Sequence, residues 1–60
     1  MINVDDEVIT KVGKAGIPAG TFGVVDSICS KGVWVSVYIP EDSDVPDDTV
    51  LYAENELRLQ

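Results

Sequence analysis

The side chains of this chain that could carry acid–base or metal chemistry are almost all carboxylates. Its 60 residues include 11 Asp or Glu, no His and one Cys. Carboxylate oxygens are ligands for hard cations such as calcium, and Asp42-Ser43-Asp44 begins like a calcium-binding loop. Val45-Pro46 then stands where a third ligand and a glycine belong. We therefore expect no metal site in this acidic stretch, which contains Glu41, Asp42, Asp44, Asp47 and Asp48.

Catalysis finds no support in the residue types. Histidine, the commonest general base, is missing, and no serine is set beside a plausible base. Cys29 has only Lys31 as a cationic neighbour in the sequence, so we expect a small buried hydrophobe rather than a reactive thiol. The glycines of residues 13–21 lack the Gly-x-x-x-x-Gly-Lys-Ser/Thr frame of a phosphate loop. We expect no enzyme activity and no cofactor.

Aromatic residues are the best candidates for binding. The alternation over residues 33–39 predicts a strand whose valines and Ile39 are buried, with Trp34 and Tyr38 together on the opposite face. Aromatic side chains of this kind line peptide grooves and anchor interfaces. We expect Phe22 or Tyr52 beside them. The alternative is that these rings cover a thin core from outside as half-buried packing.

The charge of the chain limits its partners. The formal net charge is −7, from 11 acidic and 4 basic residues. A negative surface repels nucleic acid and anionic membranes, so neither is an expected partner. The N-terminus is acidic, unlike a signal peptide, and no uncharged run approaches the roughly 20 residues that span a bilayer. A cytoplasmic protein with one domain, residues 1–60, is expected.

These candidates require a β-rich scaffold to position them. Gly23 interrupts an apolar run, which in a strand indicates a bulge, a bend or the close approach of another backbone. The glycine-rich residues 13–21 predict a loop with no regular element, from which Ile17 folds over the mouth of a barrel. Ser30-Lys31-Gly32 predicts a hairpin connection, and residues 54–56 one helical turn. The expected strands are 7–12, with Val8 and Val12 inward, then 22–29, 33–39, 49–53 and 57–59, the last pairing with the first.

Two short motifs resemble known families. Gly20-Thr21-Phe22-Gly23-Val24-Val25 resembles the Gly-x-x-Gly-x-Val core of KOW-type SH3-like domains. Residues 52–57, Tyr-Ala-Glu-Asn-Glu-Leu, resemble the closing segment of the PsaE subunit of photosystem I. The resemblance implies an all-β fold, a small five-stranded SH3-like barrel with one helical turn before the last strand. KOW domains bind RNA or ribosomal and polymerase surfaces, a role for which this chain offers Lys11, Lys14 and Lys31.

These observations favour a small acidic binding module that contacts an unidentified protein partner. The expected contact surface comprises Trp34, Tyr38, Phe22, Tyr52, Ile17 and Lys14. Self-association through an open strand edge is a further possibility. Two alternatives stay open: a KOW-type nucleic-acid-associated domain, and an acidic mimic of nucleic acid that acts on a basic protein.

Overall fold

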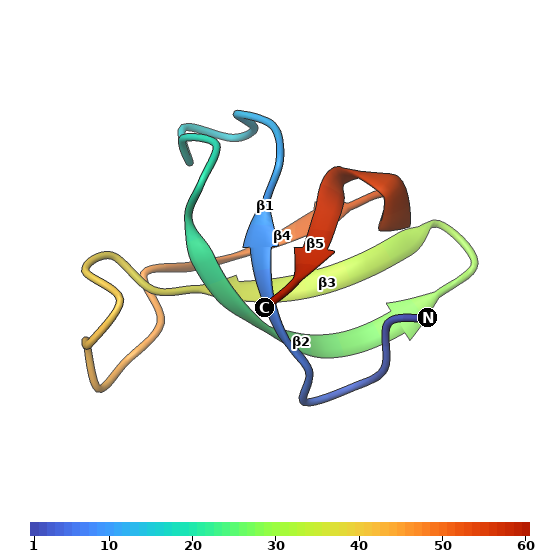
Figure 1. Ribbon diagram of the computed structural model, residues 1–60, viewed down its shortest axis with the longest axis horizontal. Helices are drawn as coiled ribbons and strands as arrows, with labels where there is room; N and C mark the ends of the chain where they lie inside the picture. The colour runs from blue at the N-terminus through green and yellow to red at the C-terminus, as the bar shows by residue number, and fades with distance from the viewer.

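The computed structural model describes all of residues 1–60 and consists of one antiparallel sheet (Figure 1). A single 3-10 turn, η1, precedes the last strand, and the strand order in the sheet is β4-β3-β2-β1-β5. The predicted fold class, all-β with five strands and one helical turn before the last, is confirmed. The elements are β1 (Glu7–Thr10), β2 (Phe22–Cys29), β3 (Gly32–Val37), β4 (Asp48–Tyr52), η1 (Glu54–Glu56) and β5 (Leu57–Leu59).

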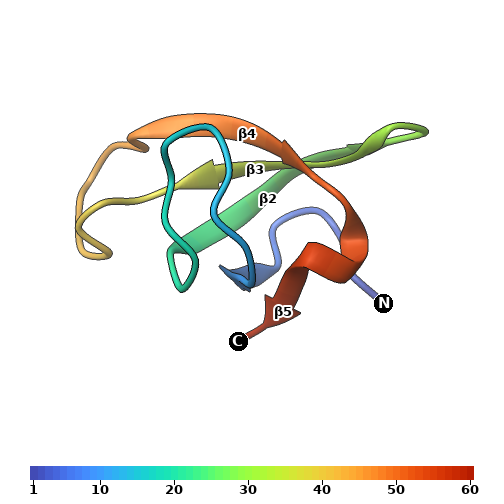
Figure 2. The same ribbon diagram turned by 90° about the horizontal axis from the view of Figure 1, so that it is seen from above.

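The sheet curls along β2, which pairs with β1 and β3. Its first residues pair with β1, and residues 23–29, apart from Asp26, pair with β3. Figure 2 shows β5 on a different level from β3 and β4, so the sheet folds back toward itself. Val25 pairs with Val35 but Ser27 pairs with Trp34, which leaves Asp26 as an extra residue in β2. This bulge increases the local bend and twist.

Gly23 lies in the regular ladder, paired with Val8 of β1 and Val37 of β3. The bulge that the sequence suggested at Gly23 is therefore located at Asp26 instead. What makes glycine necessary is the close approach of β3. A Cβ atom on Gly23 would lie 2.5 Å from Cγ1 of Val35 and 3.0 Å from the carbonyl oxygen of Ser36. Of the roles expected for this residue, close approach is the one that the packing supports.

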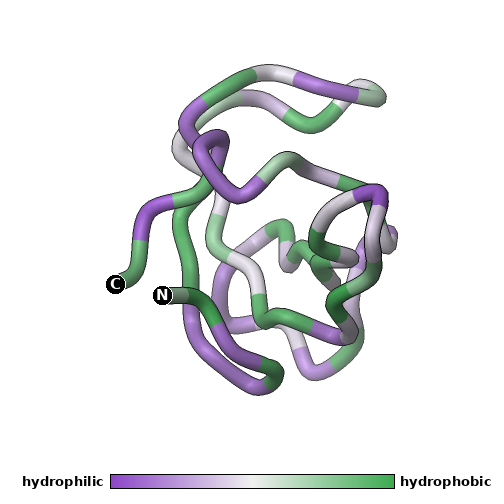
Figure 3. Tube along the Cα trace, turned by 90° about the vertical axis from the view of Figure 1, so that its right-hand side faces the viewer, coloured by the Kyte–Doolittle hydropathy of each residue, from purple (hydrophilic) through white to green (hydrophobic).

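The interior is rich in valine, as the alternation predicted. Val33, Val35 and Val37 are buried. Ile39 was expected to continue this row, but β3 ends at Val37 and the Ile39 side chain is 45% exposed. Figure 3 shows hydrophobic and hydrophilic segments alternating along the trace, as expected for strands with one buried face. The core comprises Ile2, Val8, Ile17, Val25, Val33, Val35, Val37, Val50, Tyr52 and Leu57.

Two further predictions about burial are corrected. β1 ends at Thr10, which is buried, while Val12 is only partly buried at the edge of the core. Thr10 is satisfied there because its hydroxyl donates to Pro18 O (3.2 Å) and accepts from Thr21 N–H (3.0 Å). Cys29 is exposed rather than buried. It ends β2 at the tip of the β2–β3 hairpin, beyond the reach of the core.

The segment between β1 and β2 is more ordered than predicted. Lys14 and Ile17 exchange two backbone hydrogen bonds of 2.9 Å. The residues between them, Ala15 (φ 54°) and Gly16 (φ 80°), both lie in the left-handed region. This geometry is that of a two-residue hairpin turn of the primed kind. Ile17 follows the turn and joins the core, as expected of a residue that folds back over the sheet.

The hairpin expected at Ser30-Lys31-Gly32 is present, and Gly32 has a φ of 145°. The terminal strand pairs with the first, as predicted. None of the helical structure reaches the length and apolar character needed to cross a bilayer.

Candidate functional site

An outer face, opposite the valine core, carries most of the aromatic side chains. Neighbouring positions across the ladder share a face of the sheet. Val24 is opposite Ser36 on β3, and Trp34 is opposite Leu51 on β4. Phe22 and Tyr38 lie at the end of the same face, with ring centroids 6.1 Å apart and planes at 50°. We define the outer face by these residues: Phe22, Val24, Trp34, Tyr38 and Leu51.

The outer face is half-covered rather than open. Trp34 is 38% exposed, and the other members of the outer face are of intermediate burial. The ring pair of Phe22 and Tyr38 has the tilted geometry that aromatic side chains favour. Such rings present apolar area with few rotatable bonds, and they lose little conformational entropy when a partner covers them.

The structure brings together half of the residues expected at a binding surface. Trp34 and Tyr38 share the outer face, as predicted, and Phe22 lies beside Tyr38. Tyr52 does not join them, because it pairs with Val33 and its side chain is fully buried. Ile17 is 5% exposed and belongs to the core. Neither side chain is available to a partner.

Two outer-face residues were missed from the sequence. Leu51 lies opposite Trp34, and Val24 lies opposite Ser36. Both are apolar residues in strands, so the only signal for them was the register of the pairing. That register depends on contacts between distant segments, and the strand pattern by itself does not specify it.

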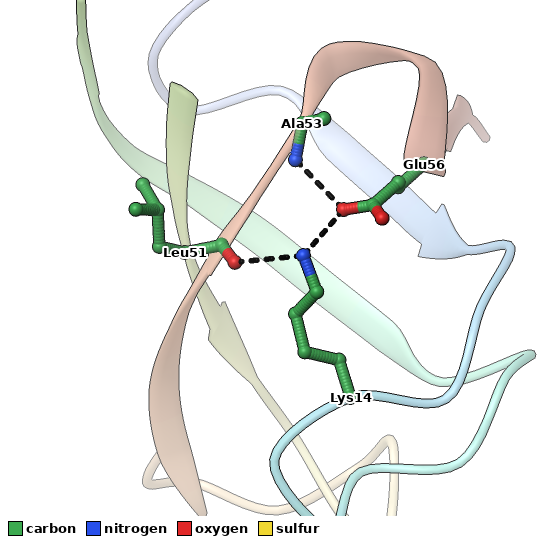
Figure 4. A network of polar contacts seen from close by, with 4 residues as sticks. All are labelled: Lys14, Leu51, Ala53 and Glu56. Carbon is green, nitrogen blue, oxygen red and sulfur yellow. Dashed lines mark hydrogen bonds and ion pairs between the residues drawn. The ribbon is translucent and has the colours of Figure 1, made fainter. Parts of the chain in front are cut away.

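Lys14 lies at the edge of β4 instead, inside a polar network (Figure 4). Its Nζ donates to Oε1 of Glu56 at 2.6 Å and to the carbonyl oxygen of Leu51 at 3.4 Å. The same Oε1 accepts the backbone N–H of Ala53 at 2.8 Å. The ammonium also lies 5.3 Å from the centroid of the Tyr52 ring, within cation–π range. We call Lys14 and Glu56 the clamp.

The clamp shifts the proton equilibria around it. Hydrogen bonds from Lys14 and from the Ala53 N–H stabilise the carboxylate, so they hold the pKa of Glu56 below its usual value. Burial and, second, the negative charge of Glu56 raise the pKa of Tyr52. The Tyr52 hydroxyl is buried without a hydrogen-bond partner.

The arrangement offers contact surface and polar anchoring. No group of three or more acidic, His or Cys side chains is close enough to hold a metal ion, and the surface has no pocket. The acidic side chains of residues 41–48 are exposed. Lys14, one of three lysines considered for nucleic-acid binding, is paired with Glu56.

In comparisons with known proteins, no family, no curated protein and no solved structure matches this chain.

Proposed function

We propose that this chain is a small acidic protein-interaction module that binds a basic partner through the outer face. The observation that carries the proposal is the concentration of aromatic side chains there. Three of the four aromatic residues, Phe22, Trp34 and Tyr38, lie on the outer face, and only Tyr52 lies in the core. Aromatic residues are enriched at protein interfaces and often supply most of the binding energy.

The polar positions of the same face support this interpretation. Ser36 and Thr49 lie opposite each other between the two apolar ends, and their hydroxyl oxygens are 3.5 Å apart. A strand surface in contact with water tolerates such residues at every outward position. The aromatic residues on either side therefore exceed what the fold requires, and a partner would cover them.

The charge of the domain favours a basic partner. The net charge is −7, and Glu7 lies opposite Val24 at the border of the outer face. Charge complementarity speeds association and excludes partners of the same sign. Binding should therefore weaken as salt is added, while the apolar contacts of the outer face set the residual affinity.

Trp34 provides a direct test, because it is the only tryptophan and it lies on the outer face. Peptides selected from a random displayed library against the folded domain should combine Lys or Arg with apolar residues. Their titration should shift the emission of Trp34 to shorter wavelength. Tyr38→Ala and Phe22→Ala should each weaken binding about tenfold or more, the loss typical of an interface anchor.

The matched control is Leu59→Ala. Leu59 is 46% exposed, similar to Trp34, but it pairs with Val8 and so lies on the core side of the sheet. Its replacement should leave binding unchanged. Equal losses for Leu59 and Tyr38 variants would contradict the proposed surface. A salt-dependent shift of Trp34 emission with random RNA or DNA, in the absence of peptide binding, would identify a nucleic-acid binder instead.

A further inference from the structure

We infer that the unpaired edge of β4 is a pairing site for the β4 strand of a second copy of this chain. Lys14 and Asp48 prevent this pairing in the native chain, because they occupy backbone groups that it requires. The groups involved are backbone N–H and C=O groups along one edge of the sheet, and none of the residues that define the outer face takes part through its side-chain atoms.

The free edge of β4 follows from the strand order. β4 is the first strand of the sheet and pairs only with β3. In an antiparallel ladder, successive residues direct their backbone groups alternately toward the neighbour and away from it. The carbonyl of Leu51 accepts from Lys14, so it points away from β3. Thr49, two residues earlier, has the same orientation.

Three of the outward groups of this edge already have partners within the chain. Thr49 N–H donates to Oδ1 of Asp48 at 2.8 Å, and Leu51 C=O accepts from Lys14 at 3.4 Å. Ala53 N–H, just beyond the end of β4, donates to Glu56 at 2.8 Å. Figure 4 shows the lysine reaching the edge from the 13–21 segment, with Glu56 beside it. Exposed edges invite pairing, and side chains that cap them suppress it.

A second copy fits the same groups. If two β4 strands paired antiparallel about a two-fold axis at Val50, Thr49 would lie opposite Leu51 of the second copy. This is a hydrogen-bonded pair in which each N–H donates to the opposite carbonyl. The bond from Thr49 N–H to Leu51 C=O uses the donor that Asp48 occupies and the acceptor that Lys14 occupies. Both capped groups are therefore those that self-pairing requires.

Charge repulsion also opposes the pairing of two β4 strands. The same two-fold pairing brings Asp47 and Asp48 of one copy next to the segment of the other that carries Glu54 and Glu56. Like charges across a strand pair are destabilising. Lys14 is the one positive charge in this network, and it is already paired with Glu56. The native chain is thus expected to stay unpaired at this edge.

The test is the double variant Lys14→Met with Asp48→Ala, which removes both caps and keeps the net charge at −7, because one positive and one negative charge are lost. Sedimentation velocity over a range of concentrations should show a dimer whose dissociation constant is at least about tenfold lower than that of the native chain. Hydrogen exchange should show protection of the Leu51 amide, which is open in the monomer.

The control is Lys31→Met with Asp44→Ala. It makes the same two replacements and the same change of charge at exposed positions outside β4. It should remain as monomeric as the native chain. A double variant that stays monomeric, or that associates without protection of Leu51, overturns the inference. If the double variant fails to fold, each single variant should form a dimer with Leu51 protected, weaker than the one expected of the double variant. Single variants that both stay monomeric would likewise overturn the inference.

Discussion

Gly23 illustrates how one missing side chain permits the packing of two strands. A Cβ atom there would approach Val35 Cγ1 to 2.5 Å and the Ser36 carbonyl to 3.0 Å. Neither group can easily make room, because the methyl belongs to a buried valine and the carbonyl belongs to the β3 backbone. Gly23→Ala should therefore lower the free energy of unfolding by about 1–3 kcal/mol, the usual cost of overpacking.

Urea denaturation followed by Trp34 emission measures this loss. Gly13→Ala is the matched control, because its nearest neighbour, the Ile17 carbonyl, is 3.7 Å away. That variant should stay within about 0.5 kcal/mol of the native chain. Equal stability of the Gly23 and Gly13 variants would show that β3 can move aside.

For the Tyr52 hydroxyl we expect the opposite result, because its removal should not lower the free energy of unfolding. The group is buried without a hydrogen-bond partner, which costs about 1–3 kcal/mol. Tyr52→Phe should therefore keep or raise the stability at pH 7. A loss above about 1 kcal/mol would mean that the hydroxyl is bound, for example by an ordered water.

The same variant tests the pKa of Tyr52. Because burial raises this pKa above 10.0, the unfolded state loses its proton first as the pH rises. The contribution is fully present below pH 10 and is lost as the pH rises through the folded pKa. The native chain should lose stability in this range, and Tyr52→Phe should lose less.

At the scale of elements, the clamp connects the 13–21 segment to η1. Glu56 has a lowered pKa because Lys14 and the Ala53 N–H stabilise its carboxylate. A lowered folded pKa gives stability that is present above the unfolded value of 4.5 and is lost as the pH falls through the folded pKa. Glu56→Gln should remove part of the loss of stability that the native chain shows as the pH falls below 4.5.

Chemical denaturation at a series of pH values would measure this effect. Glu41→Gln is a suitable control, since Glu41 is exposed in the acidic loop. Its acid dependence should match that of the native chain. If the curves of all three proteins coincide, the ion pair of the clamp does not contribute to folding, as is common for exposed pairs.

The sequence was informative where structure depends on local pattern. The alternation around Val35 predicted the buried face of β3, and Glu54–Glu56 formed the expected helical turn. Ile39 was misplaced because the alternation continues after β3 has ended. A period of two in the sequence says which face a residue takes only while the ladder lasts.

The candidate site was less accessible to such reasoning. Trp34 and Tyr38 were expected on one face because they belong to one alternating segment. Tyr52 was misassigned because its face depends on the register of β4 against β3. The pairing of Lys14 with Glu56 joins residues 42 positions apart, and no local pattern signals it.

For the whole molecule, the balance of charge is the dominant electrostatic feature. The net charge is −7 on 60 residues, and few ion pairs offset it. Repulsion among the acids destabilises the compact state, and salt screens this repulsion. The thermal midpoint should therefore rise as sodium chloride is increased from about 0.01 to 0.5 M, a range over which the Debye length falls from about 30 Å to a few ångström.

Circular dichroism at 218 nm would follow the melt. A midpoint that falls with salt would mean that attractive pairs such as the clamp outweigh the general repulsion. A midpoint that does not move would mean that the acids are too far apart to interact.

The extra residue at Asp26 has a consequence for how this architecture can vary. Up to Val25, alternate residues of β2 face the valine interior. After Asp26 this alternation continues with a shift of one residue. Deleting Asp26 would keep Val25 opposite Val35 and Ser27 opposite Trp34, because Asp26 is the residue without a partner. Ile28 and Cys29 would therefore stay on the sides that they now occupy, and the strand would lose only the added bend and twist of the bulge. A change of one residue in the length of β2 at this position would thus alter the curvature of the sheet and leave the residues that face each other unchanged.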